Sequence, residues 1–281
     1  MRWRSLLFVP GDDSVRISKA ARGNADAVIL DLEDGVPEDR KCDARAALGE
    51  AARNIAAHGK AVIIRIDNRN AAADLAAAAL CSADAIMIPK VENTGRLDEI
   101  VRLLRGHQAN GGVKSTSTTA LLPLIETPAA VPVLHDLAAH PQTIGLAFGS
   151  EDFSLALGVE PSPECLDLPC KLLSLAAAGA GKMALAVPFS LAAYRDLGGF
   201  EAAAAAARKF GATGGLCVHP GQVDTLNRCF LPPTEALDAA RAIVAAWNAP
   251  DRGGRGVITV AGQMIDLPVF LRAERLLTSI R

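Results

Sequence analysis

The chain has 281 residues, of which 50% are hydrophobic and 4% are aromatic, with 29 basic and 31 acidic side chains. This length suits one large α/β domain or two small ones, and the apolar content suffices for a sizeable core. The nearly balanced charge argues against a nucleic-acid-binding protein, which usually carries a clustered basic excess. The sequence contains no run of lysine and arginine, so a polybasic membrane-binding patch is not expected either.

The N-terminal segment, MRWRSLLFVPGDD, contains only a short apolar run that ends at Pro10. A secretion signal has a longer apolar region and a small-residue cleavage site, and a membrane span needs about 20 apolar residues. The six cysteines form no C-x-x-C pair, so we expect reduced thiols. Together these features predict a cytoplasmic protein without a membrane segment.

Short β-like segments alternate regularly with alanine-rich helical segments. The expected strands cover residues 5–9, 27–32, 61–66, 85–88, 120–125, 144–148, 183–187 and 215–218. The segments between them have helical periodicity: within 38–57, Ala44, Leu48, Ala51 and Ile55 recur at steps of three and four residues. Eight strands that alternate with helices over about 220 residues predict a TIM (β/α)8 barrel rather than a doubly wound sheet.

Two nucleotide-binding patterns fail on this sequence. A Rossmann fold has G-x-G-x-x-G after its first strand, where this chain has PGDD. The phosphate-loop-like segment 179–182, GAGK, lacks the upstream glycine and the following serine or threonine, and it precedes a strand. We therefore reject both patterns.

The regular alternation ends near residue 230. A helix is expected over 234–247, then a β-like segment over 257–260 and a short final helix. This tail is too short for an independent core, so it must pack on its own barrel or on that of a neighbour. We therefore divide the chain into a barrel domain, residues 1–232, and a C-terminal segment, residues 233–281.

Charged residues follow the predicted strands at their carboxyl ends, where the active sites of TIM barrels form. Helix capping explains aspartate there equally well, but Arg65 and Glu126 are poor caps. Because Glu126 and Asp152 follow successive strands, we expect their carboxylates to meet over the barrel mouth. Two carboxylates with waters and substrate oxygens suit Mg²⁺, and the lack of a His/Cys cluster argues against zinc. With Arg65, the pattern indicates a metal site beside an anion-binding group.

Seven sequence segments carry a family resemblance: RSLLFVPG, DAVILDLEDGVPEDRKCDAR, IIRIDN, IMIPKVE, LLPLIETPAAV, LAFGSEDFSLALG and LCVHPGQVDTLN. In this order they resemble the CitE-like acyl-CoA lyases of the HpcH/HpaI aldolase and citrate lyase β-subunit superfamily. The resemblance runs from residue 4 to beyond residue 240. It implies a TIM barrel, Mg²⁺ with Mn²⁺ as an alternative ion, and cleavage of a β-hydroxyacyl-CoA.

The resemblance also assigns roles at the barrel mouth. Glu126 and Asp152 match the metal ligands of the family, and Arg65 matches a residue that contacts the substrate. Glu33 and Asp34 match residues that hold metal-bound waters. These roles come from the resemblance, whereas the convergence of the carboxylates was expected from the strand order alone.

A second set of matched residues concerns the CoA portion of the substrate. Lys19 and the segment of Val218 and His219 match positions that help to bind it. The sequence departs from some relatives at two places nearby: Phe8 stands where they carry tyrosine, and Val15 where they carry a basic residue.

The C-terminal sequence AGQMIDLPVF places one carboxylate, Asp266, among apolar residues. Asp266 before Leu267-Pro268 suits a helix N-cap. The motif is also similar to the C-terminal lid of malyl-CoA and citramalyl-CoA lyases, in which the matching aspartate enters an adjacent subunit's active site as acid/base. This similarity implies a homotrimer or hexamer with exchanged lids, which close through a hinge at 253–256.

The resemblance implies a carbon–carbon lyase, and we expect (S)-citramalyl-CoA to be cleaved to acetyl-CoA and pyruvate. Malyl-CoA lyase, which releases acetyl-CoA and glyoxylate, is the nearest alternative. The two substrates differ by one methyl group, and a pocket discriminates such a difference by only about 1–3 kcal/mol of binding free energy. A malyl-CoA thioesterase, a citrate lyase β subunit that acts on an acyl-carrier protein, and a non-catalytic barrel remain further alternatives.

Overall fold

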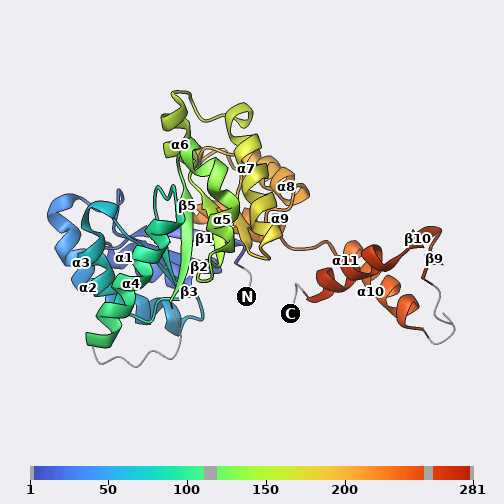
Figure 1. Ribbon diagram of the computed structural model, residues 1–281, viewed down its shortest axis with the longest axis horizontal. Helices are drawn as coiled ribbons and strands as arrows, with labels where there is room; N and C mark the ends of the chain where they lie inside the picture. The colour runs from blue at the N-terminus through green and yellow to red at the C-terminus, as the bar shows by residue number, and fades with distance from the viewer. Residues whose placement is uncertain (1–2, 111–118, 250–255, 279–281) are drawn as a thin grey trace. The chain divides into compact units, whose positions relative to one another are not determined.

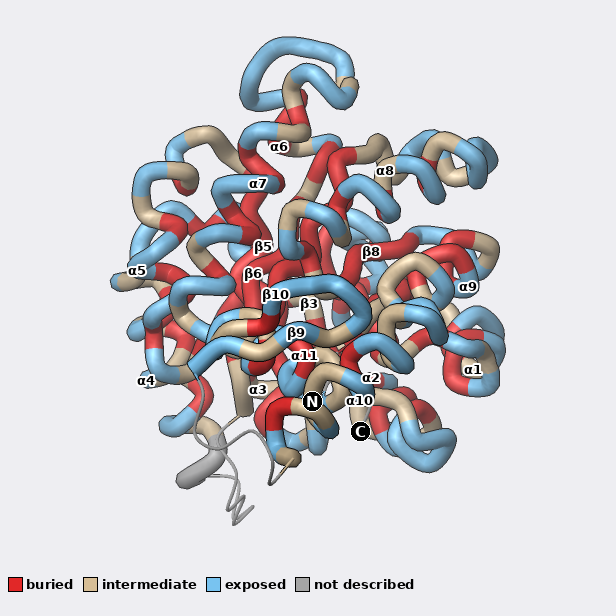
Figure 2. The backbone as a smooth tube through the Cα atoms, turned by 90° about the vertical axis from the view of Figure 1, so that its right-hand side faces the viewer, coloured by how far each residue is buried: buried red, intermediate tan, exposed pale blue. Residues whose placement is uncertain are grey.

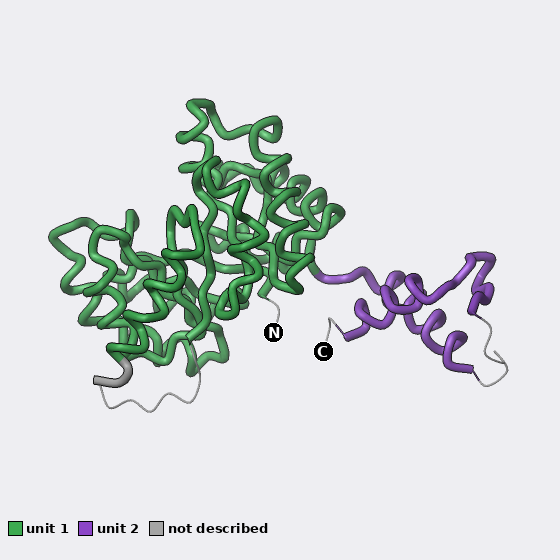
Figure 3. The backbone as a smooth tube through the Cα atoms, in the orientation of Figure 1, with its two compact units in different colours: residues 1, 3–230 green, residues 2, 231–281 purple. Residues whose placement is uncertain are grey.

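The computed structural model describes residues 3–110, 119–249 and 256–278 (Figure 1). Residues 253–255 of the expected hinge lie outside the described residues. The chain divides into two compact units, residues 3–230 and 231–281 (Figure 3), and each is considered by itself below.

Eight parallel strands form the first unit's sheet. They are β1 (Ser5–Pro10), β2 (Ala27–Asp31), β3 (Ala61–Arg65), β4 (Ala85–Ile88), β5 (Ala120–Ile125), β6 (Gly145–Phe148), β7 (Met183–Leu185) and β8 (Gly215–Cys217). The strand order is β7-β6-β5-β4-β3-β2-β1-β8, and a parallel bridge between Leu185 and Gly214 brings the two ends of the sheet together. This nearly closed sheet confirms the predicted TIM barrel.

Helices follow the strands around the barrel (Figure 1). They are α1 (Ser14–Arg22), α2 (Lys41–Ala57), α3 (Ala71–Ala79), α4 (Thr94–Asn110), α5 (Leu134–Ala139), α6 (Ser150–Leu157), α7 (Pro163–Gly179), α8 (Leu197–Lys209) and α9 (Pro220–Cys229). In the described part of the chain, no helix is long and apolar enough to cross a membrane. All six cysteines are free thiols.

The eight predicted barrel strands match the observed ones in order but differ at their ends, and a further strand over Gln263–Ile265 was not predicted. The segment predicted as a strand over 183–187 ends as a strand at Leu185, which makes a single parallel bridge to Gly214. The helix predicted over 38–57 begins with a short 3-10 turn, Glu38–Arg40, before α2.

Two apolar layers stabilise the barrel, and Figure 2 shows its strands buried among partly exposed helices. The inner layer consists mainly of strand residues, among them Leu6, Ile29, Ile63, Leu122 and Leu216. The outer layer joins the other faces of the strands to the helices, with Val28, Leu30, Val62, Ile64, Leu48 and Leu75. The alternation follows from the two-residue period of a strand.

The same period brings polar residues to the barrel mouth. On β2 the inward series of Ala27 and Ile29 continues to Asp31, and on β3 Ile63 is followed two residues later by Arg65. Glu126 continues the inward series of β5 in the same way, directly after the strand ends. The alternation that fills the core therefore also sets these charged side chains over its upper end.

The C-terminal unit contains α10 (Thr234–Asn248), the antiparallel pair β9 (Ile258–Val260) and β10 (Gln263–Ile265), and α11 (Leu267–Thr278). Ala261 and Gly262 join the two strands with φ values of 48° and 80°, as in a type I′ hairpin turn. Its small core contains Trp247, Ile265 and Phe270, and the Trp247 and Phe270 rings stack with centroids 5.2 Å apart.

Candidate functional site

Arg65 is held at the barrel mouth by two acidic residues of β2 and the segment after it. Its Nε and Nη2 atoms lie 2.7 and 2.6 Å from the Asp31 carboxylate oxygens, and Nη1 lies 2.9 Å from Glu33 Oε2. Burial by itself lowers the pKa of Arg65, but the carboxylates around it outweigh this effect and raise the pKa above its ordinary value. The guanidinium also lies over the Phe8 ring, 4.8 Å from its centroid. Arg65 is therefore a fixed, permanently charged group.

Asp31 orients Arg65, and the backbone orients Asp31 in turn. Asp31 and Arg65 are register partners on adjacent strands. The Asp31 carboxylate also accepts hydrogen bonds from the amides of Glu33 and Gly35, both at 2.9 Å. A side chain at Gly35 would collide with this carboxylate, so glycine is required there.

The other acidic groups meet around Lys90. The Lys90 ammonium lies 3.2 Å from Asp152 Oδ1 and 3.4 Å from Glu33 Oε1, and the Lys90 backbone amide donates to Glu126 Oε2 at 3.0 Å. A side chain at Gly149 would collide with Glu126, which therefore depends on a glycine at the start of α6. The structure thus brings Glu126 and Asp152 into one cluster.

Negative charge is in excess at this cluster. Burial, together with the nearby Glu33 carboxylate, raises the pKa of Glu126 to about 8. Burial raises the pKa of Glu33 as well, although Arg65 and Lys90 oppose the shift. Both shifts show that the cations present do not fully compensate the buried carboxylates, which is the electrostatic condition that an added cation would relieve.

The donor set suits a hard metal ion that keeps part of its hydration. Among the residues that the structure describes, no group of three or more His, Cys, Asp or Glu side chains forms a complete metal cage. Mg²⁺ is commonly held by one or two carboxylates, with water and substrate oxygens completing an octahedron. Glu126 and Asp152 are such a pair, so the residues present fit Mg²⁺.

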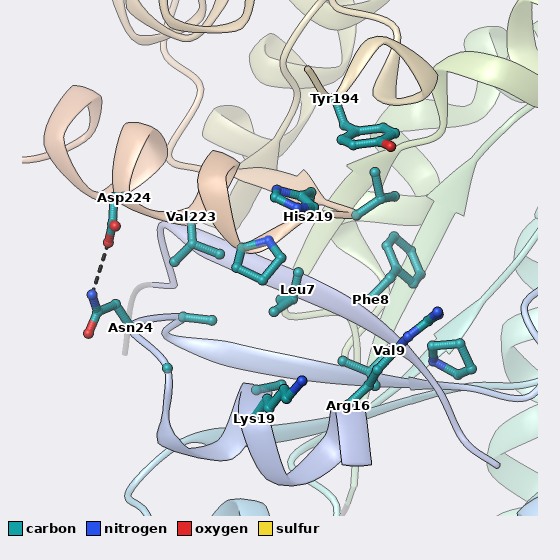
Figure 4. Close-up of a pocket in the computed structure, with 16 residues that line it drawn as sticks. Leu7, Phe8, Val9, Arg16, Lys19, Asn24, Tyr194, His219, Val223 and Asp224 are labelled. Carbon is teal, nitrogen blue, oxygen red and sulfur yellow. Dashed lines mark hydrogen bonds between the residues drawn. The ribbon is translucent and has the colours of Figure 1, made fainter. Parts of the chain in front are cut away.

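Two adjoining cavities are lined by the predicted site residues of the barrel, with the exception of Glu33. An acidic pocket of about 540 Å³ is lined by Arg65, Glu126, Asp152, Asp34, Asp31 and apolar side chains. A basic cleft of about 560 Å³ is lined by Lys19, Arg16, Val218, His219 and others (Figure 4). Phe8, Pro10, Arg16, Tyr194 and Val218 line both. The two cavities therefore lie side by side at these residues.

The basic cleft lies between β1, α1 and the start of α9. Arg16 and Lys19 come from α1, and His219 lies across the cleft from Lys19 (Figure 4). His219 Nδ1 accepts a hydrogen bond from the Gly221 amide at 3.1 Å and caps α9, so its proton belongs on Nε2. Its ring stacks on Tyr194 with centroids 5.2 Å apart. The cleft offers cationic groups at one wall and flat rings at the other.

Asp266 belongs to the C-terminal unit and is half-buried. Its Oδ1 accepts a hydrogen bond from the Val269 amide at 3.1 Å, and its carbonyl accepts one from Phe270 at 3.0 Å. Asp266 is thus the N-cap of α11, as one of the two sequence interpretations proposed. The capping contact does not test the other interpretation of Asp266, and its role as an acid/base stays a prediction.

Sequence reasoning missed Asp31 and Lys90 as site residues, as well as Arg16 and Tyr194 at the junction of the cavities. The signal for Asp31 is the two-residue period, which puts it in the inward series opposite Arg65. The position of Lys90 has no such signal, because its φ of 52° takes it out of the strand pattern.

The chain matches the HpcH/HpaI aldolase/citrate lyase family over residues 4–220. It belongs to this family. It is 33% identical to the citrate lyase subunit beta of Escherichia coli, over 98% of this chain and 92% of that protein. It is 31% identical to the (3S)-malyl-CoA thioesterase of Cereibacter sphaeroides, over 94% and 90%.

A solved structure has the same architecture. The chain resembles CitE from Mycobacterium tuberculosis, in complex with magnesium, acetoacetate and coenzyme A, with a TM-score of 0.75 and 29% identity over 99% of this chain and 97% of that chain. The citrate lyase beta subunit from the same organism, with oxaloacetate and magnesium, has a TM-score of 0.67 and 28% identity over 82% and 98%. The family resemblance noted in the sequence is confirmed, and the chain is a member of a lyase superfamily.

Proposed function

We propose that this chain is a Mg²⁺-dependent lyase that cleaves a β-hydroxyacyl-CoA, with (S)-citramalyl-CoA as its substrate and acetyl-CoA and pyruvate as its products. One observation carries the proposal: the acidic pocket around Arg65, Glu126 and Asp152 adjoins the basic cleft and shares lining residues with it. A thioester whose acyl group lies in the pocket can therefore extend its CoA portion along the cleft.

The basic cleft suits the CoA portion of this substrate. Arg16 and Lys19 place two cations on one exposed helix face, where they can pair with phosphate oxygens. Tyr194 and Val218 lie where the two cavities meet, so they would line the passage of the pantetheine arm. A related structure that contains coenzyme A supports a CoA thioester as the substrate.

The acidic pocket suits the acyl portion. Glu126 and Asp152 would hold Mg²⁺, which when bound supplies Lewis-acid stabilisation of the substrate's carboxylate and β-oxygen. The apolar side chains of Leu124, Leu191 and Leu216 line the same pocket. Their presence favours a substrate with a methyl group, as in citramalyl-CoA, over malyl-CoA.

The reaction breaks the bond between the α- and β-carbons of the acyl group. The β-hydroxyl passes its proton to solvent water and becomes the carbonyl of the keto acid, and the electrons of the broken carbon–carbon bond form the acetyl-CoA enolate. Arg65, fixed by Asp31 and Glu33, places positive charge in the pocket where this negative charge develops. Because Arg65 is already oriented, its field requires no rearrangement during the reaction.

We propose that Asp266 of an adjacent subunit protonates the enolate carbon, or removes that proton in the condensation direction. Met264, Leu267 and Leu271 support a lid role, because these large apolar side chains are exposed on the C-terminal unit around Asp266. Burial of such a face against a neighbour would exclude water from the acidic pocket. The active form is then a homo-oligomer with exchanged lids.

A second candidate is hydrolysis of malyl-CoA, which the similarity to a (3S)-malyl-CoA thioesterase favours. The same cavities would bind the thioester, and water would attack its carbonyl. The relationship to a citrate lyase subunit beta also keeps an acyl-carrier protein as an alternative acyl donor.

Product analysis separates these reactions. The purified protein would be incubated with Mg²⁺ and either (S)-citramalyl-CoA or malyl-CoA, and CoA species and acids would be separated by chromatography. We expect acetyl-CoA and pyruvate from citramalyl-CoA at the higher rate. Free CoA with intact malate would instead establish the thioesterase, and inertness toward both thioesters would overturn the lyase proposal.

A further inference from the structure

Lys90 connects all three carboxylates of the acidic cluster. Its ammonium contacts Asp152 at 3.2 Å and Glu33 at 3.4 Å, and its backbone amide donates to Glu126 at 3.0 Å. Its φ of 52° lies in the left-handed region, which is costly for a residue with a side chain. Because this conformation directs the amide to one carboxylate and the ammonium to two others, the residue is specialised for the cluster.

The two contacts of Lys90 act differently toward an incoming metal ion. The amide holds Glu126 and carries no net charge, so it orients this ligand without opposing a cation. The ammonium contacts an oxygen of Asp152, the other proposed ligand, and it repels a second cation a few ångströms away. The side chain and the backbone of one residue therefore have opposite effects on metal binding.

We propose that Lys90 is a tethered counterion: its ammonium balances Glu33 and Asp152 in the metal-free protein and competes with Mg²⁺ for Asp152. The inference rests on the proposed function, because it assumes that Glu126 and Asp152 bind the ion. Lys90 is thus a positioning residue that keeps the carboxylates together before the metal arrives and lowers the affinity for it. A solvent-exposed lysine without these contacts would neither hold the carboxylates together nor lower the affinity for the metal ion.

Removal of the ammonium should tighten metal binding. We expect Lys90→Gln to bind Mg²⁺ about tenfold more tightly than the wild type, since a like charge near the ion is lost. Lys90→Arg keeps the charge and should remain near the wild-type affinity. The measurement is isothermal titration calorimetry with MgCl₂ alone, without substrate.

Two further variants serve as controls. Lys90→Gly also lacks the ammonium, retains the backbone amide and suits the left-handed conformation, so it should bind Mg²⁺ as tightly as Lys90→Gln. Lys171→Gln removes a matched lysine on α7, where the ammonium pairs with Asp167 at the surface, and it should leave the affinity unchanged.

Thermal unfolding provides an independent readout. In EDTA, Lys90→Gln should melt at a lower temperature than the wild type, because the acidic cluster loses its cation. Saturating Mg²⁺ should then raise its melting temperature by more than it raises that of the wild type. A Lys90→Gln protein as stable as the wild type in EDTA would overturn the counterion role.

The outcomes separate this inference from the proposed function. If the wild type binds Mg²⁺ and Lys90→Gln binds it equally or more weakly, the competition by Lys90 is wrong while the metal site stands. If the wild type neither binds Mg²⁺ nor gains stability from it, the proposed metal function itself is wrong. Tighter binding by both neutral variants, with Lys90→Arg unchanged, supports the inference.

Discussion

Arg65 at the barrel mouth is buried and fixed by contacts to Asp31 and Glu33, which the register of two adjacent strands and the segment after them bring to it. Asp266 in the C-terminal unit is half-buried and caps a helix beside a three-residue core. The first arrangement needs the whole sheet, whereas the second needs only a hairpin and a helix. In the proposed function, the barrel binds metal and substrate, and the C-terminal unit supplies the proton.

The largest expected effect tests this division directly. Asp266→Asn should lower turnover by about 10²–10⁴-fold, because the acid/base group is lost while the α11 cap survives through the amide oxygen. Affinities for Mg²⁺ and the acyl-CoA should remain near the wild-type values. Steady-state kinetics and calorimetry on the same preparations measure both, and unchanged turnover would reduce Asp266 to a helix cap.

Mixing two inactive variants tests whether the small unit serves a neighbouring subunit. Asp266→Asn and Arg65→Gln would be unfolded, mixed in equal amounts and reassembled. About a quarter of all sites should combine an intact barrel with an intact Asp266 from the adjacent subunit. We expect activity to return to a corresponding fraction of the wild type. No recovery in an oligomer that demonstrably mixes would show that each chain supplies its own acid.

A change within the barrel should weaken the metal site instead of proton transfer. Glu126→Gln removes one proposed ligand, and we expect Mg²⁺ affinity to fall by at least about tenfold, since outer-shell changes alone cause 10–100-fold losses. Calorimetry with MgCl₂ measures this loss. An unaltered affinity would exclude Glu126 as a ligand.

The same variant has a pH signature in the metal-free protein. The pKa of Glu126 is raised to about 8 in the folded state, against about 4.3 in an unfolded chain. The folded state therefore binds more protons between these values, so the free energy of unfolding falls as pH rises through this window. Glu126→Gln removes this dependence and should gain stability relative to the wild type from pH 5 to pH 8. Denaturant melts in EDTA measure the difference, and parallel pH profiles would contradict the assigned shift.

Trp247→Ala should have the smallest effect on turnover, but it should clearly lower the stability of the C-terminal unit. The substitution removes a ring that stacks on Phe270 and should destabilise the C-terminal unit by about 3 kcal/mol. Hydrogen exchange should increase in α10 and α11 and remain unchanged in the barrel strands. Equal loss of protection in both would show that the units unfold together.

Much of the fold was predictable because its determinants are local. Short apolar runs rich in Val, Ile and Leu, such as 27–31 and 61–65, mark strands, and the three- and four-residue steps in 41–57 mark a helix. Strand ends were less certain by one or two residues, because they depend on where a neighbouring strand stops offering hydrogen bonds. Beyond Leu185, for example, the pairing with the segment at Gly214 is limited to a single bridge.

The candidate site was predictable in part. The strand order already indicated that Glu126 and Asp152 meet, and in the structure both residues line one pocket together with Arg65. The contribution of Asp31 required the register between β2 and β3, and that of Lys90 required its left-handed backbone. The two-residue period indicates that Asp31 faces inward, but its pairing with Arg65 and the backbone of Lys90 are not visible in the residue pattern alone.

The sequence by itself determined which residues alternate, which end a strand and which family the chain resembles, because these are properties of neighbouring residues along the chain. Only the tertiary structure decided that Lys90 faces Glu33 and Asp152, that the pKa of Glu126 is raised to about 8, and that two cavities join at Tyr194. The physical reason is that closure of the barrel brings charges from distant strands within a few ångströms and removes them from water, and both effects depend on distances in space.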